Sequence, residues 1–351
     1  MLSVRIALSV LALALVSACG GGGGGGAAAN NTAIIGLTVD NAATPTKLVV
    51  ANADNQTIQT LTLSTNAVAT LAGTANTAGT ADGTGTTAKF YEPFGITLSG
   101  SDYFVADTYN HTIRKLTSAG VVTTIAGSAG TWGSTDGTGA AALFNGPKSL
   151  VSDGTNLYVT DTSNHSIRQV VISTGVTTTL AGYGSYSVSG TSDGTGSAAR
   201  FYAPFGVAIQ GANLYVTDTG NHTIRKVTTG GVTTTLAGTA GTYGTTDATG
   251  TSALFNTPTG IVSDGTNLYV ADSGNHTIRK VVIVGGAVTT LAGTAGTSGS
   301  ADGTGAAARF SQPVGLTIDN AGNLYVSDQN YTKIRKIVTS TGVVTTISAT
   351  F

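Results

Sequence analysis

Asp, His and Arg recur together in one short motif, and in that combination they could do acid–base chemistry. The motif reads DTYNHTIRK in its first full copy, and its five copies begin at Asp107, Asp161, Asp218, Asp272 and Asp328. The chain has four histidines, and all belong to the motif: His111, His165, His222 and His276. A catalytic group is needed once, whereas a structural group is needed in every copy of a repeat. We therefore interpret the motif as structural and call it the staple.

Each residue type of the staple has an expected role. We expect the Asp to accept hydrogen bonds from the backbone amides of its own turn, and the Asn to take the left-handed conformation. We expect the Arg to reach a carbonyl or a carboxylate of a neighbouring unit. The staple residues are Asp107, His111, Arg114, Asp161, His165, Arg168, Asp218, His222, Arg225, Asp272, His276, Arg279, Asp328 and Arg335. The alternative is that the histidines form a repeated ligand-binding face.

Few other residues are suited to catalysis or metal binding. The chain has one cysteine, Cys19, and one glutamate, Glu92, which we interpret as a solvated loop residue. Aspartates recur in the connections between the units, at Asp82, Asp136, Asp193, Asp247 and Asp302. Each connection offers one such carboxylate, whereas calcium needs several oxygen ligands. We favour capping of a single helical turn, with a Phe anchored behind it, over a calcium site, and we expect no cofactor.

The staples repeat at intervals of 54 to 57 residues, which predicts six similar units. The first unit is degenerate, with Asn52, Gln56 and Gln59 in place of Asp, His and Arg. Each unit contains four strand-like runs, which in the fifth unit span residues 260–264, 267–271, 277–283 and 287–291. Four antiparallel strands repeated six times predict a six-bladed β-propeller, an all-β fold. We expect the ring to close by packing of the first blade on the sixth.

The stretches LYVAD, GNHTIRK, VVTTLAG and DGTGAAARFSQPVGL closely resemble the NHL-repeat family, over about residues 34 to 348. The resemblance implies a six-bladed propeller. Related six-bladed enzymes of the lactonase type hold a divalent metal on the propeller axis. The innermost strands of this chain offer no ring of carboxylates for that purpose. They begin with Ile35, Phe94, Lys148, Phe205, Thr259 and Val314, followed further in by Thr38, Thr97, Val151, Ala208, Val262 and Thr317.

Aromatic residues in the connections and staple turns are the candidates for partner binding. Connections and staple turns should share one face of the propeller, and loops there are free to vary while the strands keep the scaffold. The candidate residues are Trp132, Tyr243, Tyr183, Tyr186 and Tyr109, with Lys148, Phe94 and Phe205 at the mouth of the channel. The alternative is that these rings only pack over the loops beneath them.

The first residues predict export. Residues 1–19 combine Arg5 with an apolar run that is too short to span a membrane, and end in Val-Ser-Ala-Cys. This resembles a lipoprotein signal peptide, in which Cys19 is lipidated. Residues 20–33 form a Gly- and Ala-rich tether, and residues 34–351 the propeller. Gly20 favours the outer membrane, by resemblance to Gram-negative sorting, and leaves open whether the protein faces the periplasm or the outside.

Composition limits the function further. The net charge is −1 and only 9% of residues are charged, so no basic surface for nucleic acid is expected. We expect a monomeric, membrane-tethered binding or scaffold propeller in the cell envelope, with a protein or carbohydrate ligand on its loops and a lipid anchor as its contact with the membrane. The alternative is an enzyme of the lyase or lactonase type, with a metal or polar site near the channel mouth. Whether any catalysis occurs stays open.

Overall fold

The structure is a computed structural model, which describes residues 34–42, 46–328 and 332–351. The predicted signal segment, Cys19 and the tether therefore lie outside the described residues. The described residues belong to one compact unit. Among the residues that the structure describes, no helix is long and apolar enough to cross a membrane.

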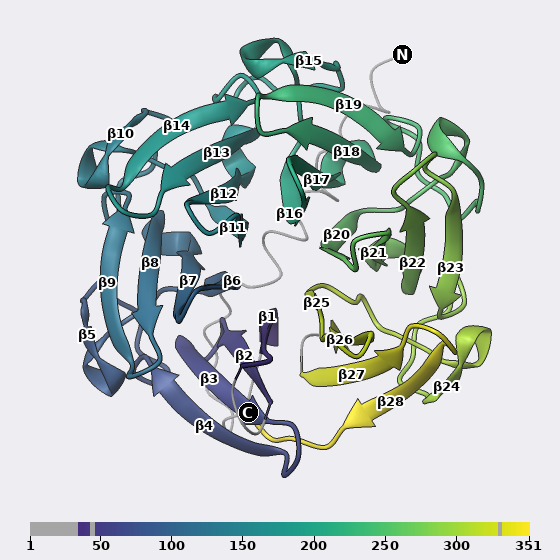
Figure 1. Ribbon diagram of the computed structural model, residues 1–351, viewed down its shortest axis with the longest axis horizontal. Coiled ribbons are helices and arrows are strands. Elements are labelled where there is room, and N and C mark those ends of the chain that lie inside the picture. Colours follow the sequence, from purple (N-terminus) through teal and green to yellow (C-terminus); the bar gives the residue numbers. More distant parts are fainter. Residues whose placement is uncertain (1–33, 43–45, 329–331) are drawn as a thin grey trace, which may run out of the picture. The chain divides into compact units, whose positions relative to one another are not determined.

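Six antiparallel sheets stand around a central axis as the blades of a propeller, as predicted (Figure 1). Blade 1 consists of β1 (Ile34–Asp40), β2 (Lys47–Asn52), β3 (Thr57–Thr62) and β4 (Ala67–Ala72). Blade 2 consists of β5 (Gly83–Thr84), β6 (Pro93–Ser99), β7 (Asp102–Asp107), β8 (Thr112–Thr117) and β9 (Val121–Ala126). Blade 3 consists of β10 (Gly137–Thr138), β11 (Pro147–Ser152), β12 (Asn156–Asp161), β13 (Ser166–Val171) and β14 (Val176–Ala181).

The remaining three blades repeat this pattern. Blade 4 consists of β15 (Gly194–Thr195), β16 (Pro204–Gln210), β17 (Asn213–Asp218), β18 (Thr223–Thr228) and β19 (Val232–Ala237). Blade 5 consists of β20 (Pro258–Ser263), β21 (Asn267–Asp272), β22 (Thr277–Val282) and β23 (Val288–Ala292). Blade 6 consists of β24 (Gly303–Thr304), β25 (Leu316–Ile318), β26 (Asn323–Asp328), β27 (Lys333–Val338) and β28 (Val343–Ile347).

Short 3₁₀ turns are the only helices among the described residues. Four of them lie in staples: η2 (Thr108–Asn110), η4 (Thr162–Asn164), η6 (Thr219–Asn221) and η8 (Ser273–Asn275). Five lie in the connections: η1 (Gly85–Thr87), η3 (Gly139–Ala141), η5 (Gly196–Ala198), η7 (Gly250–Ser252) and η9 (Gly305–Ala307). The single helical turn expected in each connection is thus present.

Burial of the strands follows their place in the blade. In β21, which reads NLYVAD, every residue after the first is buried, because neighbouring blades cover both faces of the strand. The outer strand β9 alternates at its start between an exposed Val121 and a buried Val122, as expected of a strand with one covered face. The core is therefore divided into layers between blades. One fully buried Phe from each connection lies in these layers: Phe90, Phe144, Phe201, Phe255 and Phe310.

A short fifth strand completes four of the blades and is not predictable from the sequence runs. After crossing from the preceding blade, the connection pairs with the outer edge of the new blade, as β5 does with β9. Blade 5 has a single bridge of this kind, between Thr249 and Ala287. Blade 1 has four strands and ends at β4. The fifth strand covers an edge that would otherwise present unpaired backbone groups.

The ring closes where blade 6 packs on blade 1, as predicted. The Val39 amide donates to Thr317 Oγ1 at 3.3 Å, and Ser327 Oγ donates to the Ile35 carbonyl at 3.2 Å. Tyr325 and Ile334 of blade 6 share a buried apolar cluster with blade 1 residues. Figure 1 shows the C-terminal segment running from β28 to blade 1, and Phe351 packs against the same cluster.

Candidate functional site

The staple turns and the connections lie at the same end of the strands, and we call this end the loop face. Each staple joins the second strand of a blade to the third, and each connection leads from an outer strand to the next innermost strand. Because successive strands of a blade run in opposite directions, both kinds of link fall at the same end of the strands. The turns between first and second strands lie at the opposite end, which we call the turn face.

Each staple Arg lies between two carboxylates. Arg114 Nη1 is 2.6 Å from Asp107 Oδ2, and its Nη2 is 2.8 Å from Asp82 Oδ1. The same guanidinium donates to the carbonyls of Lys89 and Ala81, and lies over the Phe90 ring. Equivalent pairs occur at Arg168, Arg225, Arg279 and Arg335. The Arg thus fastens the connection that arrives from the preceding blade to the third strand.

Two details of the expected staple are wrong. The Asp107 carboxylate makes no capping bond to its own turn; it accepts from the Tyr91 amide at 2.8 Å and from Asn110 Nδ2 at 2.8 Å. The left-handed residue is His111, with φ 58°, and not the Asn. The reason is that the Asn side chain is needed as a bridge between Asp107 and the connection, where it also donates to the Gly79 carbonyl. Burial raises the pKa of Asp107 to about 6, although Arg114 and the other donors lower it.

The connection aspartates are the outer partners of the Arg and do not cap the helical turn, contrary to expectation. Asp82 Oδ2 accepts from the Thr124 amide at 3.1 Å, and Oδ1 from the Thr124 hydroxyl at 3.0 Å. The helical turn that follows has Thr84 as its N-cap residue, so Asp82 is not at the capping position. The same bonds recur at Asp136, Asp193, Asp247 and Asp302. These oxygens already have protein donors, and no group of three or more metal-ligating side chains occurs among the residues described.

The histidines hold one blade to the next. His222 Nδ1 accepts the amide of Thr257 at 3.0 Å, just before the innermost strand of the following blade. His111, His165 and His276 do the same for Gly146, Ala203 and Gln312. The held residue precedes a proline and has a positive φ each time, a conformation that is disfavoured before proline. Because Nδ1 must accept, the imidazole is neutral, and burial lowers the pKa of all four histidines.

Blade 1 builds the same contacts without charge. Asn52 Nδ2 donates to Gln59 Oε1 at 3.1 Å in place of the ion pair. Gln56 Oε1 accepts the Glu92 amide at 2.6 Å in place of a histidine. The Gln56 backbone is also left-handed, with φ 60°. The degenerate unit is therefore an amide version of the staple.

The channel mouth on the loop face brings together four predicted residues. Phe94 and Phe205, from blades 2 and 4, meet edge to face with ring centroids 5.3 Å apart. Lys148 Nζ lies 3.8 Å from the Phe94 ring centroid and 5.9 Å from that of Tyr109. Lys148 is only 8% exposed, so the mouth is largely filled by its own side chains.

Glu92 belongs to this mouth and was misjudged from the sequence. It is buried, not solvated, because its backbone is held by Gln56 at the start of the blade 2 innermost strand. Burial raises the pKa of Glu92 to about 7, Lys148 lowers it and Asp54 raises it. A carboxyl group that exchanges its proton near neutral pH can serve as a general acid or base.

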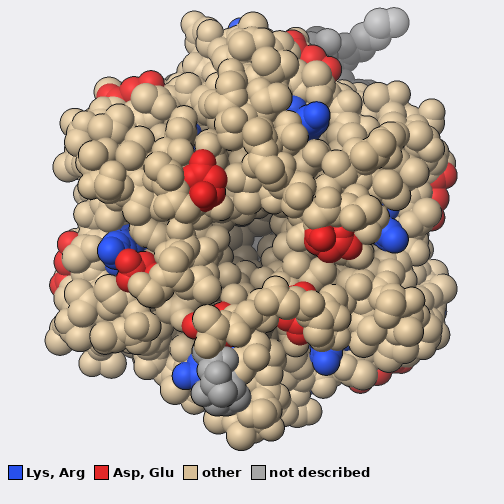
Figure 2. Space-filling model, viewed as in Figure 1, with Lys and Arg blue, Asp and Glu red and all other residues tan. Residues whose placement is uncertain are grey.

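Below the mouth, the channel is a cavity of about 200 Å³ lined by the innermost strands. The expected inner ring of Thr38, Thr97, Val151, Ala208, Val262 and Thr317 does line it. No carboxylate is found among these described lining residues. The face shown in Figure 2 is hollowed at its centre, and a few charged side chains of both signs are scattered around the opening.

Four of the predicted loop aromatics, Trp132, Tyr183, Tyr186 and Tyr243, are exposed, whereas Tyr109 is half-buried. Trp132 and Tyr186, from successive connections, are 57% and 63% exposed and pack edge to face with centroids 5.8 Å apart. Tyr183 lies under the Arg200 guanidinium, 4.9 Å from ring centroid to Cζ. Tyr243 is 65% exposed and contacts His222. The loop face thus has a peripheral aromatic cluster formed by the contact of Trp132 with Tyr186, and Tyr183 lies in the same connection as Tyr186.

Comparison with known proteins agrees with this geometry. The family model of the NHL repeat matches residues 255–281, which cover blade 5 from its connection to its third strand. The chain is an NHL-repeat protein. It is 32% identical over 272 residues to the chloroplastic protein SUPPRESSOR OF QUENCHING 1 of Arabidopsis thaliana, covering 71% of this chain and 25% of that protein. It is 29% identical over 271 residues to NHL repeat-containing protein 2 of Gallus gallus, covering 68% of this chain and 37% of that protein. The chain thus spans well under half the length of these curated relatives.

Solved structures share the fold with this NHL-repeat chain. An auxiliary nutrient binding protein from Bacteroides thetaiotaomicron has a TM-score of 0.65 and 16% identity, with 90% of this chain and 70% of that chain covered. Catalytically inactive virginiamycin B lyase from Staphylococcus aureus with quinupristin has a TM-score of 0.55 and 13% identity, with 91% of this chain and 85% of that chain covered. At these identities the likeness concerns the fold alone.

Proposed function

We propose that this NHL-repeat propeller binds a carbohydrate or protein ligand on its loop face while a lipid on Cys19 holds it at a membrane of the cell envelope. The observation that carries the binding proposal is the exposed contact between Trp132 and Tyr186. Exposed aromatic rings on loops fastened at their base give large contact area at low entropic cost. The nutrient binding protein of the same fold is consistent with such a role.

A saccharide is the favoured ligand of the aromatic cluster. The two connection segments that carry the rings, residues 128–135 and 183–192, consist of Ser, Thr, Gly, Ala and Val around the aromatics and contain no charged residue. Hydroxyl groups and aromatic faces suit a neutral polyhydroxylated ligand, and the charged group that contacts these rings is the Arg200 guanidinium over Tyr183. A protein partner is the other outcome of the test.

The test is binding of the purified protein to a glycan array, together with pull-down from an envelope extract. Trp132→Ala should weaken capture by on the order of tenfold or more without lowering the melting temperature, because the ring is mostly exposed. Tyr243→Ala is the matched control: Tyr243 occupies the equivalent place in another connection and lies outside the cluster. Equal capture by all three proteins would defeat the proposal.

A second candidate is a lyase-type enzyme, and the raised pKa of Glu92 supports it. Glu92 would act as the acid or base, with Lys148 beside it favouring the charged form. Incubation with quinupristin, which the lyase of the same fold holds, would reveal turnover, and Glu92→Gln should abolish it. No turnover by the unmodified chain would end this candidate for that substrate.

A further inference from the structure

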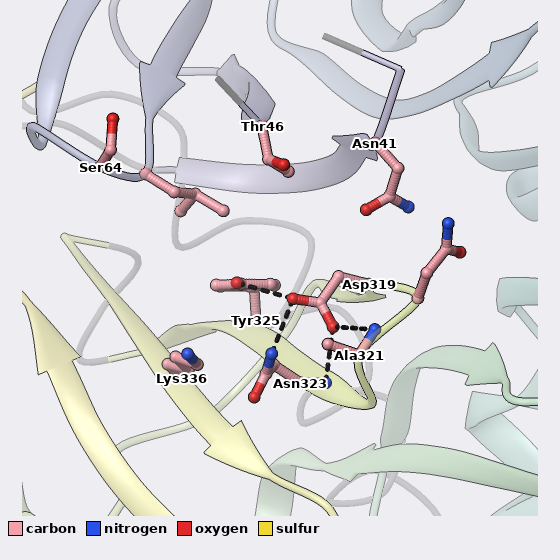
Figure 3. A pocket seen from close by; sticks show the side chains of 10 residues that line it. Asn41, Thr46, Ser64, Asp319, Ala321, Asn323, Tyr325 and Lys336 are labelled. Carbon is pink, nitrogen blue, oxygen red and sulfur yellow. Dashed lines mark hydrogen bonds between the residues drawn. The ribbon is translucent and has the colours of Figure 1, made fainter. Parts of the chain in front are cut away.

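A second cavity, distinct from the channel, opens at the seam between blades 1 and 6. It measures about 620 Å³, within the range of about 300–1,000 Å³ usual for small-molecule sites. Among the described residues, its walls are Asn41 and Thr46 beside the ends of β1 and β2, the β3–β4 turn of blade 1, and the β25–β26 turn with β26 and β27 of blade 6. It therefore lies toward the turn face, away from the aromatic cluster. We call it the seam cleft (Figure 3).

The seam cleft forms where the two least regular units of the ring meet. Residues 41–46 join β1 to β2, whereas residues 153–155 are enough to join β11 to β12 in a regular blade. Residues 319–322 join β25 to β26, which also exceeds the regular turn. Both walls therefore differ from the regular blades, so this cavity does not recur between the other blades in the same form.

The acidic group of the cleft is already satisfied. Asp319 accepts from the amides of Ala321 and Asn323 at 2.9 and 2.8 Å, from Asn323 Nδ2 at 2.8 Å and from the Tyr325 hydroxyl at 3.0 Å. Although burial raises it, the Asn323, Tyr325 and Ala321 donors hold the pKa of Asp319 below its usual value. The carboxylate therefore remains ionised and fixes the turn.

The basic group of the cleft, Lys336, has no such partner among the residues that the structure describes. Lys336 lies directly across from Tyr325 in the β26–β27 ladder and lines the cleft. No ion pair or hydrogen bond joins its ammonium to any residue that the structure describes. Lys115, at the same position in blade 2, is paired with Asp102 at 2.8 Å. Lys336 is thus a half-buried cation in a walled cavity.

The other polar groups of the cleft are neutral. Figure 3 shows the Asn41 amide and the Thr46 hydroxyl on the blade 1 wall, facing the Asp319 turn across the cavity, with Ser64 further along. These groups can donate and accept hydrogen bonds. Among the described lining residues, the cleft has one cation, Lys336, and one carboxylate, Asp319, whose hydrogen bonds are already made. This combination matches a monoanion better than a dianion such as phosphate, since the second charge would face Asp319.

We propose that the seam cleft binds a small acidic saccharide, with its carboxylate on Lys336 and its hydroxyl groups on the amide and hydroxyl side chains of blade 1 and of the Asp319 turn. The ligand would contact both blades at once. Because it would bind only the closed ring, it would also stabilise the folded protein.

The experiment is calorimetric titration of the full chain with digalacturonic acid, with galactobiose as the uncharged probe. Saturable binding of digalacturonic acid, weakened at higher ionic strength, is expected. Lys336→Gln should reduce affinity on the order of tenfold. The matched control is Lys280→Gln at the equivalent position of blade 5; blade 3 carries Gln169 there, so the fold accepts the change.

Three results would overturn the proposal. They are no saturable binding of digalacturonic acid, equal affinity of wild type and Lys336→Gln, or equal loss in both lysine variants. Unchanged melting temperatures without ligand would show that the variants are folded. Trp132→Ala should titrate as wild type does, so failure of the aromatic cluster as a ligand site would leave this result unaffected.

Discussion

At the scale of single residues, the staple Arg is the most constrained side chain of the propeller. Arg225 is 1% exposed and Asp218, its inner partner, is fully buried. Each of the five Arg residues also stacks on a Phe and reaches a second carboxylate in the connection. A planar guanidinium can make these contacts together, whereas an ammonium cannot.

Arg225→Ala should therefore destabilise the protein by about 3–5 kcal/mol, because it leaves the Asp218 charge buried without its partner. Chemical denaturation followed by fluorescence measures this. Lys226→Ala, one residue along the same strand, should change stability by less than about 0.5 kcal/mol. Equal stability of Arg225→Ala and wild type would refute the role of the ion pair.

The histidine contacts predict a pH dependence. As pH falls below about 6.5, the histidine of the unfolded chain takes up a proton before the folded one does, since burial lowers the folded pKa of His222. The stability due to this contact is complete above that pH and declines below it. The staple aspartates act in the opposite direction because burial raises their pKa, so a variant must be compared with wild type.

His222→Gln isolates this effect, because Gln56 makes the same contact in blade 1. Between pH 7 and pH 5 the melting temperature of His222→Gln should fall less than that of wild type. Parallel curves for the two proteins would show that protonation of His222 does not weaken the blade contact.

At the scale of elements, the four main strands of each blade could be predicted because alternating β-branched runs and turn residues repeat at one period. The fifth strand could not, since two residues such as Gly83 and Thr84 carry no periodic signal. Burial of Glu92 was also beyond the sequence, because it depends on Gln56 and Lys148 from neighbouring blades. The sequence was enough to recognise the Asp, His and Arg of the staple as one structural motif. Their hydrogen-bond partners could not be predicted, because many of them lie in the connection, which is distant in sequence.

The outer strand β4 should be the least protected of the outer strands. Among the described residues it has no fifth strand outside it and no connection aspartate bonded to it, unlike β9, β14 and β19. Hydrogen exchange measured by mass spectrometry should show faster exchange in Ala67–Ala72 than in those three strands. Slow exchange of β4 would mean that other contacts replace the missing strand.

At the scale of the whole molecule, blades 1 and 6 are held together by packing and a few hydrogen bonds, whereas the other blades are also linked by fastened connections. The seam is consequently the junction where a bound ligand would change stability most. Its proposed ligand and the aromatic cluster would occupy opposite ends of the propeller.

The proposed anchor concerns the molecule as a unit, because it decides where both binding faces operate. Cys19→Ala should shift the protein from the membrane fraction to the soluble fraction of disrupted cells without changing its melting temperature. Fractionation followed by immunodetection measures this. Retention of the variant in the membrane fraction would exclude lipidation of Cys19 as the means of attachment.

The connections are closed at their base by recurrent backbone bonds, such as Gly127 N to Gly139 O at 3.0 Å and Gly182 N to Gly196 O at 3.1 Å. The second bond closes a longer segment than the first, yet blades 3 and 4, to which these connections lead, have the same arrangement of strands. The additional residues of the second connection lie before its Arg-bound aspartate, Asp193, so the tip of a connection can be exchanged or lengthened with little effect on the ring as long as that aspartate is kept. For protein engineering, each connection is a grafting position: a randomised library inserted there would be displayed side by side with its neighbours on an otherwise unaltered scaffold.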